Sequence, residues 1–174
     1  MSTATIFGVN DRPLFLVGFM GSGKTYWGSK WAAALHRTFF DLDHVIEEQE
    51  QYSVAELFFN KGESWFRQKE AEVLRSLSLR KNVLIACGGG TACFHSNMDL
   101  MNHAGATIFL DASPTYLLQN ILKEPLARPL LQNMDEVQIL EFIKTKLQER
   151  EPFYRESTFI LNAESLNEDS LNYL

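Results

Sequence analysis

A glycine-rich turn that carries one lysine is the first feature of this sequence that points to chemistry. Residues 18–25 read GFMGSGKT and match the pattern GxxxxGK[ST] without a gap. The turn follows an apolar run and precedes a helical pattern, so its N–H groups can surround an anion. Lys24 would add positive charge, and the Thr25 hydroxyl suits Mg²⁺. The motif predicts a nucleoside triphosphate site that involves Gly21, Ser22, Gly23, Lys24, Thr25 and Tyr26.

Two aspartates follow the second apolar run of the chain. Asp41 and Asp43 are two residues apart in FFDLDHVIEE, so both carboxylates can lean to the same side of an extended chain. A DxD pair alone is weak evidence for a ligand site. On local grounds the alternative is that Asp43 is the N-cap of the helix that follows, and the two roles can coexist.

Three successive glycines follow the third apolar run. Gly88, Gly89 and Gly90 serve no purpose in a buried strand, but they let the backbone approach a small ligand closely and offer it N–H donors. The alternative is a plain flexible turn.

Two arginines have the chemistry to bind an organic acid. Arg67 and Glu70 are three residues apart on one helical face, where the carboxylate can hold the guanidinium group in place, although an ordinary surface pair has the same spacing. Arg150 stands at the C-terminal end of a predicted helix. The helix dipole favours a cation there, so the arginine could equally serve only that purpose. A planar guanidinium fork matches a carboxylate in a way that lysine does not, so the two arginines favour an acidic substrate.

The elements that must position these residues alternate between strands and helices. This alternation predicts a three-layer α/β/α fold with a five-stranded parallel sheet. The expected strands are Leu14–Val17, Thr38–Phe40, Val83–Cys87, Thr107–Leu110 and Thr158–Leu161. Helices are expected from GSGKT to about Leu35, over 53–62 and 63–79, and over 136–150. The last should bury Val137, Leu140, Ile143 and Leu147 and end at Pro152. We expect one domain over residues 1–174, with a surface loop at about 123–135 and the acidic substrate held by the helices of about 43–80.

Composition limits the kinds of partner. The chain has 174 residues, 45% of them hydrophobic, and a formal net charge of −6, so a broad basic face for nucleic acid is not expected. No apolar stretch reaches the length of a membrane span, and the first residues lack the blocks of a secretion signal, which makes the cytoplasm the expected location. Cys87 and Cys93 do not form a disulfide framework. No heptad pattern is present, and we expect a monomer.

Together these residues resemble the shikimate kinase family. The resemblance covers roughly residues 12 to 165 and rests on six motifs in the same order: Gly18–Thr25, Asp41/Asp43, Phe66–Glu70, Gly88–Gly90, Arg128–Leu131 and Arg150–Tyr154. It implies a P-loop fold like that of nucleoside monophosphate kinases, with a short lid at about 123–135. It also implies phosphorylation of the 3-hydroxyl of shikimate by ATP with Mg²⁺, in aromatic amino acid biosynthesis.

The resemblance also implies a role for each matching residue. Asp43 would bind the reacting hydroxyl, and Lys24 and Arg128 would act on the transferred phosphate, Arg128 from the lid. Arg67 and Arg150 would hold the substrate carboxylate, the glycines Gly88, Gly89 and Gly90 would contact the substrate, and Thr25 and Asp41 would bind Mg²⁺.

Two departures from the family pattern and several alternatives stay open. Tyr26 and Trp27 stand where the family usually has a small hydroxyl residue, and the lid offers only Lys123 ahead of Arg128, which predicts weaker nucleotide binding or a leaky lid. Adenine contacts are expected near Asn162 to Ser165. A gluconate kinase or another small hydroxy-acid kinase is the main alternative. A nucleoside monophosphate kinase and a binding module without catalysis are less favoured, the module because Lys24, Thr25 and Asp43 are all present.

Overall fold

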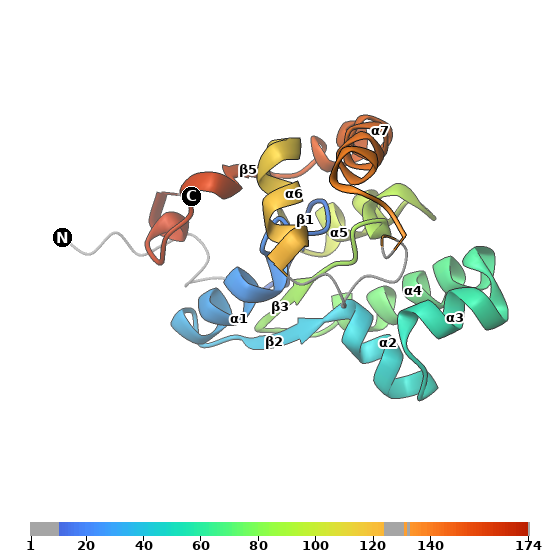
Figure 1. Cartoon of the computed structure of the whole chain (residues 1–174). Coiled ribbons are helices and arrows are strands. Elements are labelled where there is room, and N and C mark those ends of the chain that lie inside the picture. Colours follow the sequence, from blue (N-terminus) through green and yellow to red (C-terminus); the bar gives the residue numbers. More distant parts are fainter. Residues whose placement is uncertain (1–10, 124–130, 132, 174) are drawn as a thin grey trace.

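Five short strands form one parallel sheet in the computed structural model, which describes residues 11–123, 131 and 133–173. The strands are β1 (Leu14–Val17), β2 (Thr38–Asp41), β3 (Val83–Ala86), β4 (Ala106–Asp111) and β5 (Phe159–Asn162). Their order across the sheet is β2-β3-β1-β4-β5, and all neighbouring pairs are parallel (Figure 1). After β1 the chain forms β2 and β3 on one side of that strand, and later forms β4 and β5 on its other side. A ligand crevice is therefore expected at the carboxyl end of β1, where the glycine turn begins.

Helices cover both faces of this sheet (Figure 1). They are α1 (Lys24–Ala34), α2 (Leu42–Glu50), α3 (Val54–Lys61), α4 (Glu63–Ser78), α5 (Asn97–Ala104), α6 (Pro114–Lys123) and α7 (Glu136–Tyr154), with short 3-10 helices at Thr91–Cys93, Ala163–Ser165 and Ser170–Tyr173. Helices α3 and α7 begin with reciprocal capping boxes, Ser53 with Glu56 and Asp135 with Gln138.

The core has two layers because the strands bury both of their faces. Along β1, Leu14 and Leu16 pack in one cluster with Trp31 of α1, Leu117 of α6 and Ile143 of α7. The alternate residues Phe15 and Val17 pack in the other cluster with residues of α2 to α5 and with Tyr154. All four side chains of β1 are at most 2% exposed. This alternation confirms the three-layer α/β/α prediction.

The end of α7 and its buried side differ from the sequence prediction. The helix does not end at Pro152 but continues through it to Tyr154. Pro152 lies in the last turn, where it removes one intrahelical hydrogen bond to the carbonyl oxygen of residue 148, and the helix ends two residues later. Val137 is 71% exposed, and the side chains buried under the helix are Ile139 and Ile143. The predicted stripe was therefore wrong at Val137, where it missed Ile139, and correct at Ile143, while Leu147 is partly buried against the core.

Helix α2 is capped by a different aspartate from the one considered in the sequence. The N-cap is Asp41, whose Oδ1 accepts a hydrogen bond of 3.4 Å from the backbone N–H of His44. Asp43 lies inside the first turn of α2. The capping alternative for Asp43 was therefore wrong, and its carboxylate is available for another role.

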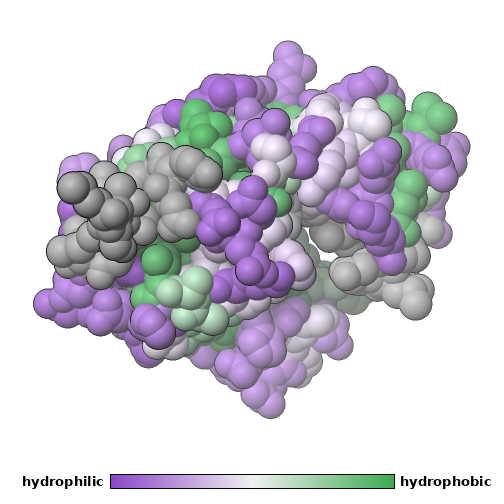
Figure 2. Space-filling view, turned by 90° about the vertical axis from the view of Figure 1, so that its left-hand side faces the viewer, coloured by the Kyte–Doolittle hydropathy of each residue, from purple (hydrophilic) through white to green (hydrophobic). Residues whose placement is uncertain are grey.

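The surface is mostly hydrophilic on the face shown in Figure 2, where hydrophobic residues form separate patches. Within the described ranges, every helix is too short or too polar to cross a lipid bilayer.

Candidate active site

The glycine turn after β1 takes backbone conformations that glycine adopts far more easily than other residues. Gly18, Gly21 and Gly23 have φ angles of 143°, 82° and 93°. A Cβ atom added to Gly18 would lie 2.9 Å from the carbonyl oxygen of Leu110 in β4, so this position also lacks space for a side chain. Helix α1 begins at Lys24 without a side-chain cap. The turn thus leaves N–H groups and the positive end of α1 for an anion.

Lys24 and Ser22 have side chains that suit a bound phosphate. Lys24 is only 8% exposed, and its Nζ donates hydrogen bonds of 2.8 Å to the carbonyl oxygens of Gly18 and Phe19. The Ser22 hydroxyl is buried and has no hydrogen-bond partner among the described residues. Such a group destabilises a protein unless a partner arrives. A phosphate oxygen in the turn would be that partner, so the residues present fit a nucleotide.

The two predicted magnesium ligands touch each other. Thr25 Oγ1 donates a hydrogen bond of 2.7 Å to Asp41 Oδ2, which brings the first turn of α1 to the carboxyl end of β2. Mg²⁺ is typically bound by one or two protein oxygen atoms together with substrate phosphates and water. A hydroxyl and a carboxylate side by side, next to a phosphate-binding turn, fit such an ion.

Asp43 has a strongly perturbed carboxyl group. Burial, and then the negative charges of Glu70 and Asp41, raise its pKa from 3.8 to about 7, although Lys24 and Arg67 act in the opposite direction. A carboxyl group with this pKa changes its protonation state near neutral pH. It can therefore accept a proton from a hydroxyl group under physiological conditions.

Arg67 is fixed by carboxylates in a buried ion pair. Its NH1 donates a hydrogen bond of 2.9 Å to Glu70 Oε2, and its NH2 lies 3.3 Å from Glu63 Oε1. Glu70 is 0% exposed and accepts a second hydrogen bond of 2.6 Å from Thr91 Oγ1. The surface-pair alternative was therefore wrong. The guanidinium group also lies 4.5 Å from the ring centre of Phe94, which further limits its orientation.

Arg150 and Tyr154 reach the same place from the last two turns of α7. An added Cβ on Gly89 would lie 3.4 Å from Arg150 NH1, and the guanidinium group of Arg150 lies 5.4 Å from the ring centre of Phe19. The Tyr154 hydroxyl donates a hydrogen bond to the carbonyl oxygen of Gly89. Burial raises the pKa of Tyr154, so this hydroxyl stays protonated and remains a donor.

The three glycines after β3 are the point where these groups meet. An added Cβ would lie 2.8 Å from Asp43 Oδ1 at Gly88 and 2.5 Å from Arg67 NH2 at Gly90. None of the three has a positive φ angle, so lack of space, and not backbone conformation, favours glycine at residues 88 and 90. The flexible-turn alternative is not supported, because the segment is packed against four functional side chains.

One cavity joins the phosphate turn to Gly88 and Gly89, the first two of the three glycines. Its volume is about 920 Å³, and it is lined by Gly23, Lys24 and Thr25 of the turn, by Asp41 and Asp43, and by Gly88 and Gly89. A different part of its wall comes from Tyr26 and Trp27 of α1 and from Tyr116, Asn120 and Lys123 of α6. The cavity is large enough for a nucleotide and a small acid together.

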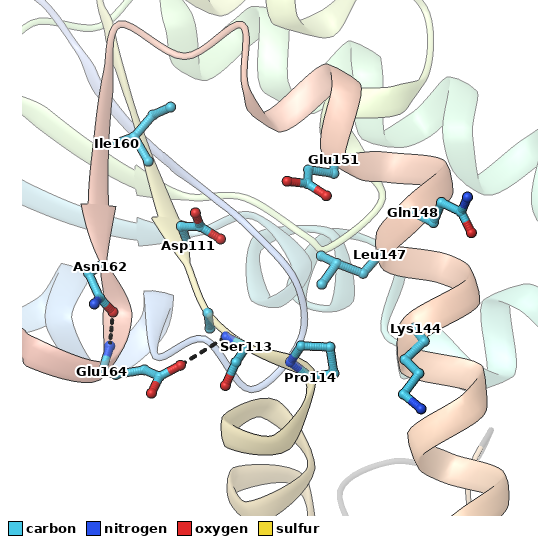
Figure 3. A pocket seen from close by; sticks show the side chains of 11 residues that line it. Asp111, Ser113, Pro114, Lys144, Leu147, Gln148, Glu151, Ile160, Asn162 and Glu164 are labelled. Atoms are coloured by element: carbon cyan, nitrogen blue, oxygen red, sulfur yellow. Dashed lines mark hydrogen bonds between the residues drawn. The ribbon is translucent and has the colours of Figure 1, made fainter.

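A second cavity of about 750 Å³ lies at the ends of β4 and β5, beside α7 (Figure 3). Its carboxylates are already engaged. Glu164 accepts a hydrogen bond of 3.0 Å from the Ser113 N–H, and Asp111 and Glu151 both pair with Arg155. Asn162 and Glu164 line this cavity, so their side chains do not reach the phosphate turn. The adenine contacts expected near Asn162 to Ser165 stay a prediction.

The structure brings together most of the side chains that the sequence singled out. Lys24, Thr25, Asp41 and Asp43 line one cavity. Arg150 lies beside Gly89 of this cavity, and Arg67 lies beside the adjacent Gly90. Arg128 lies outside the described residues. The sequence analysis gave no role to Thr91, Tyr154 or Asn120. Tyr154 stood in a recognised motif, whereas Thr91 and Asn120 carried no local signal.

The chain is similar to shikimate kinases over most of its length. The family model described as Shikimate kinase matches residues 20–173. A shikimate kinase of Bacteroides fragilis is 41% identical over 157 residues, which cover 90% of this chain and 88% of that protein. The crystal structure of shikimate kinase from Bacteroides thetaiotaomicron has a TM-score of 0.89 at 38% identity and covers 93% of this chain and 95% of its own.

A further solved structure is that of shikimate kinase from Acinetobacter baumannii in complex with shikimate. It has a TM-score of 0.81 at 31% identity, and the match covers 93% of this chain and 89% of that one. Together with the cavity that joins a phosphate turn to an arginine-lined glycine segment, these similarities show that the chain belongs to the shikimate kinase family.

Proposed function

We propose that this protein transfers the γ-phosphate of ATP to the 3-hydroxyl of shikimate, as one kinase domain over residues 1–174. One observation carries the proposal beyond family membership. Asp43, Arg150 and Arg67 approach three successive glycines, and the first two of these glycines line the cavity that also contains Lys24. A carboxylate that can accept a hydroxyl proton, two arginines that can bind an acid group and a phosphate-binding turn therefore lie close enough together to serve one small substrate and one nucleotide.

The acceptor is held by its acid group. Arg67 and Arg150 bind the carboxylate of shikimate through guanidinium hydrogen bonds, and the backbone of Gly88, Gly89 and Gly90 closes on the ring. Arg67 is held by Glu63 and Glu70, so little of its side-chain freedom remains to be lost on binding. Asp43 lies beside Gly88 and accepts a hydrogen bond from the hydroxyl group that reacts.

The donor is held by the turn. The N–H groups of Gly21 to Tyr26 surround the β and γ phosphates, the Ser22 hydroxyl gains a phosphate oxygen as partner, and Lys24 moves from its carbonyl partners to the phosphates. Thr25 and Asp41 hold Mg²⁺. When bound, this ion neutralises charge on the phosphates. Arg128 is assigned to the phosphates by resemblance alone.

The reaction is a direct transfer. The 3-hydroxyl oxygen attacks the γ-phosphorus, the bond from that phosphorus to the bridging β–γ oxygen breaks, and ADP leaves. The hydroxyl proton passes to the Asp43 carboxylate. Because the transition state is loose, the proton moves late, and positioning and charge neutralisation by Lys24 provide most of the acceleration.

A coupled ADP-release assay tests the proposal with shikimate, gluconate and no acceptor. We expect rapid ADP release with shikimate and very slow release in the other two reactions. Faster turnover with gluconate would establish the alternative kinase. ATP binding by calorimetry without turnover on either acid would instead show a module without catalysis. Appreciable release without an acceptor would show that the lid admits water.

A further inference from the structure

A buried hydroxyl group follows directly after the three glycines. It belongs to Thr91, the first residue of the 3-10 helix Thr91–Cys93. Thr91 is 0% exposed, so its side chain cannot touch a substrate in the cavity. Its backbone N–H donates a hydrogen bond of 3.1 Å to the Gly88 carbonyl oxygen, and its carbonyl oxygen accepts one of 2.9 Å from Asn97 Nδ2. Any part that Thr91 plays in the reaction must therefore pass through its neighbours.

The Thr91 hydroxyl supplies a hydrogen-bond donor to Glu70. Glu70 Oε1 accepts a hydrogen bond of 2.6 Å from Thr91 Oγ1, and Glu70 Oε2 accepts one of 2.9 Å from Arg67 NH1. Glu70 is 0% exposed, and a buried carboxylate oxygen that lacks a donor is strongly unfavourable. Each oxygen atom of Glu70 has its own donor, so the carboxylate forms a bridge from Thr91 to Arg67.

The space around this bridge is shared with a second carboxylate. An added Cβ on Gly88 would lie 2.8 Å from Asp43 Oδ1 and 3.0 Å from Glu70 Oε1, and the Thr91 hydroxyl is 3.1 Å from the same point. Two negative charges that face one small space disfavour each other. Without the Thr91 hydroxyl, Glu70 Oε1 would face Asp43 and lack this donor. The Glu70 carboxylate would then gain by turning away, and the hydrogen-bond partner of Arg67 would move with it.

The orientation of Arg67 matters for the substrate. The guanidinium group is held by Glu70 at NH1, by Glu63 at a distance of 3.3 Å from NH2, and by the ring of Phe94, whose centre lies 4.5 Å away. A guanidinium fork forms two parallel hydrogen bonds with a carboxylate only when the two planes are aligned. The position of NH1 in this fork therefore depends on Glu70.

We propose that Thr91 is a positioning residue for the acceptor. Through Glu70, its hydroxyl holds the Arg67 guanidinium in the orientation that binds the substrate carboxylate. The inference rests on the proposed function for the nature of the acceptor and adds a residue that does not touch it. An arginine held in this way loses little freedom when the acid binds. Thr91 therefore affects the affinity for the acid and not the affinity for the nucleotide.

Steady-state kinetics of Thr91→Val, which removes the hydroxyl, test this role in the full chain. KM for shikimate should rise at least about fivefold, since a hydrogen bond to a charged group is lost. KM for ATP should stay within about twofold, and kcat should change less than KM for shikimate, because Arg67 binds the acid group alike in the ground and transition states. Thr91→Ser keeps the hydroxyl and should restore KM for shikimate to within about twofold of the original value.

Two further variants guard against effects of packing. Thr91→Ala removes the same hydroxyl without adding an apolar group, and it gives the same test if the valine variant does not fold. The matched control is Thr38→Val, an exposed position at the start of β2, which should leave both KM values unchanged.

A double variant separates positioning from a general weakening of the fold. In Glu70→Ala the Thr91 hydroxyl has lost its acceptor, so adding Thr91→Val should not raise KM for shikimate further. The full effect of Thr91→Val on top of Glu70→Ala would overturn the inference. An equal rise of KM for both substrates in Thr91→Val would also overturn it, as would an unchanged KM for shikimate.

Failure of the proposed function gives a different result. If the original protein phosphorylates gluconate and not shikimate, the proposed function is wrong, and the same measurements with gluconate, which also has an acid group, decide the role of Thr91. If calorimetry shows that the original protein binds neither acid, both the proposed function and this inference are wrong.

Discussion

Replacing Asp43 by asparagine should remove most of the turnover and also stabilise the folded protein above neutral pH. The pKa of Asp43 is raised from 3.8 to about 7, mainly by burial. One pKa unit corresponds to about 1.36 kcal/mol, so the ionised carboxylate lowers the free energy of unfolding by up to about 4 kcal/mol. Turnover should fall more than about 100-fold, the lower end of what a general base contributes.

The sign of this effect follows from the two states. Below pH 4 the carboxyl is protonated in both the folded and the unfolded chain, and ionisation costs nothing. Between pH 4 and 7 only the folded state keeps the proton, so the stability of the original protein falls as the pH rises. The stability gained by Asp43→Asn should therefore grow by about 2–3 kcal/mol between pH 5 and pH 8.

Urea unfolding of both proteins at pH 5 and pH 8, without ligands, measures this gain. Asp99→Asn, at an exposed position on α5, is the control for the same chemical change. In parallel, kcat/KM of the original protein should fall as the pH drops below about 7. If the stability difference is the same at both pH values, the carboxyl is not desolvated as described. If Asp43→Asn turns over normally, Asp43 is not the acceptor of the proton.

Three further substitutions separate the parts of the site. Arg67→Lys keeps the charge but loses the planar fork, so KM for shikimate should rise at least about tenfold while KM for ATP stays the same; a change confined to ATP would contradict the acid anchor. Tyr154→Phe removes the hydrogen bond to Gly89 and should raise KM for shikimate about 2- to 10-fold and lower the free energy of unfolding by about 0.5–1.5 kcal/mol. Asp41→Asn should raise the Mg²⁺ concentration for half-maximal activity about tenfold, and an unchanged Mg²⁺ titration would remove Asp41 from the metal site.

The elements with strong local patterns were predictable from the sequence. The five apolar runs became the five strands within one or two residues, because short apolar segments between turn residues are typical of strands buried on both faces. The glycine turn was found because its chemistry requires fixed residues at fixed spacing. Arg67 and Glu70 were paired correctly because helical geometry alone brings residues three apart together.

Other features depend on tertiary contacts that no local pattern shows. The burial of Glu70 follows from its packing under Thr91, which is 21 residues away in the sequence. Asn120 lies 99 residues from Gly21 and still binds the turn. The stripe of α7 was misplaced because Val137 and Ile139 fit helical spacing equally well, and only the position of the sheet decides between them. The monomeric state and the role of Arg128 stay predictions.

The glycine segment after β3 has a consequence for how the site tolerates change. Alanine at residue 88 would collide with the Asp43 carboxylate, and alanine at residue 90 with the Arg67 guanidinium, whereas alanine at residue 89 would meet Arg150 only at ordinary contact distance. Substitutions at these three adjacent glycines would thus each affect a different functional group. The main chain of these glycines therefore sets how much space the substrate acid has beside Asp43 and the two arginines. A substitution at these positions can reduce that space but cannot readily increase it.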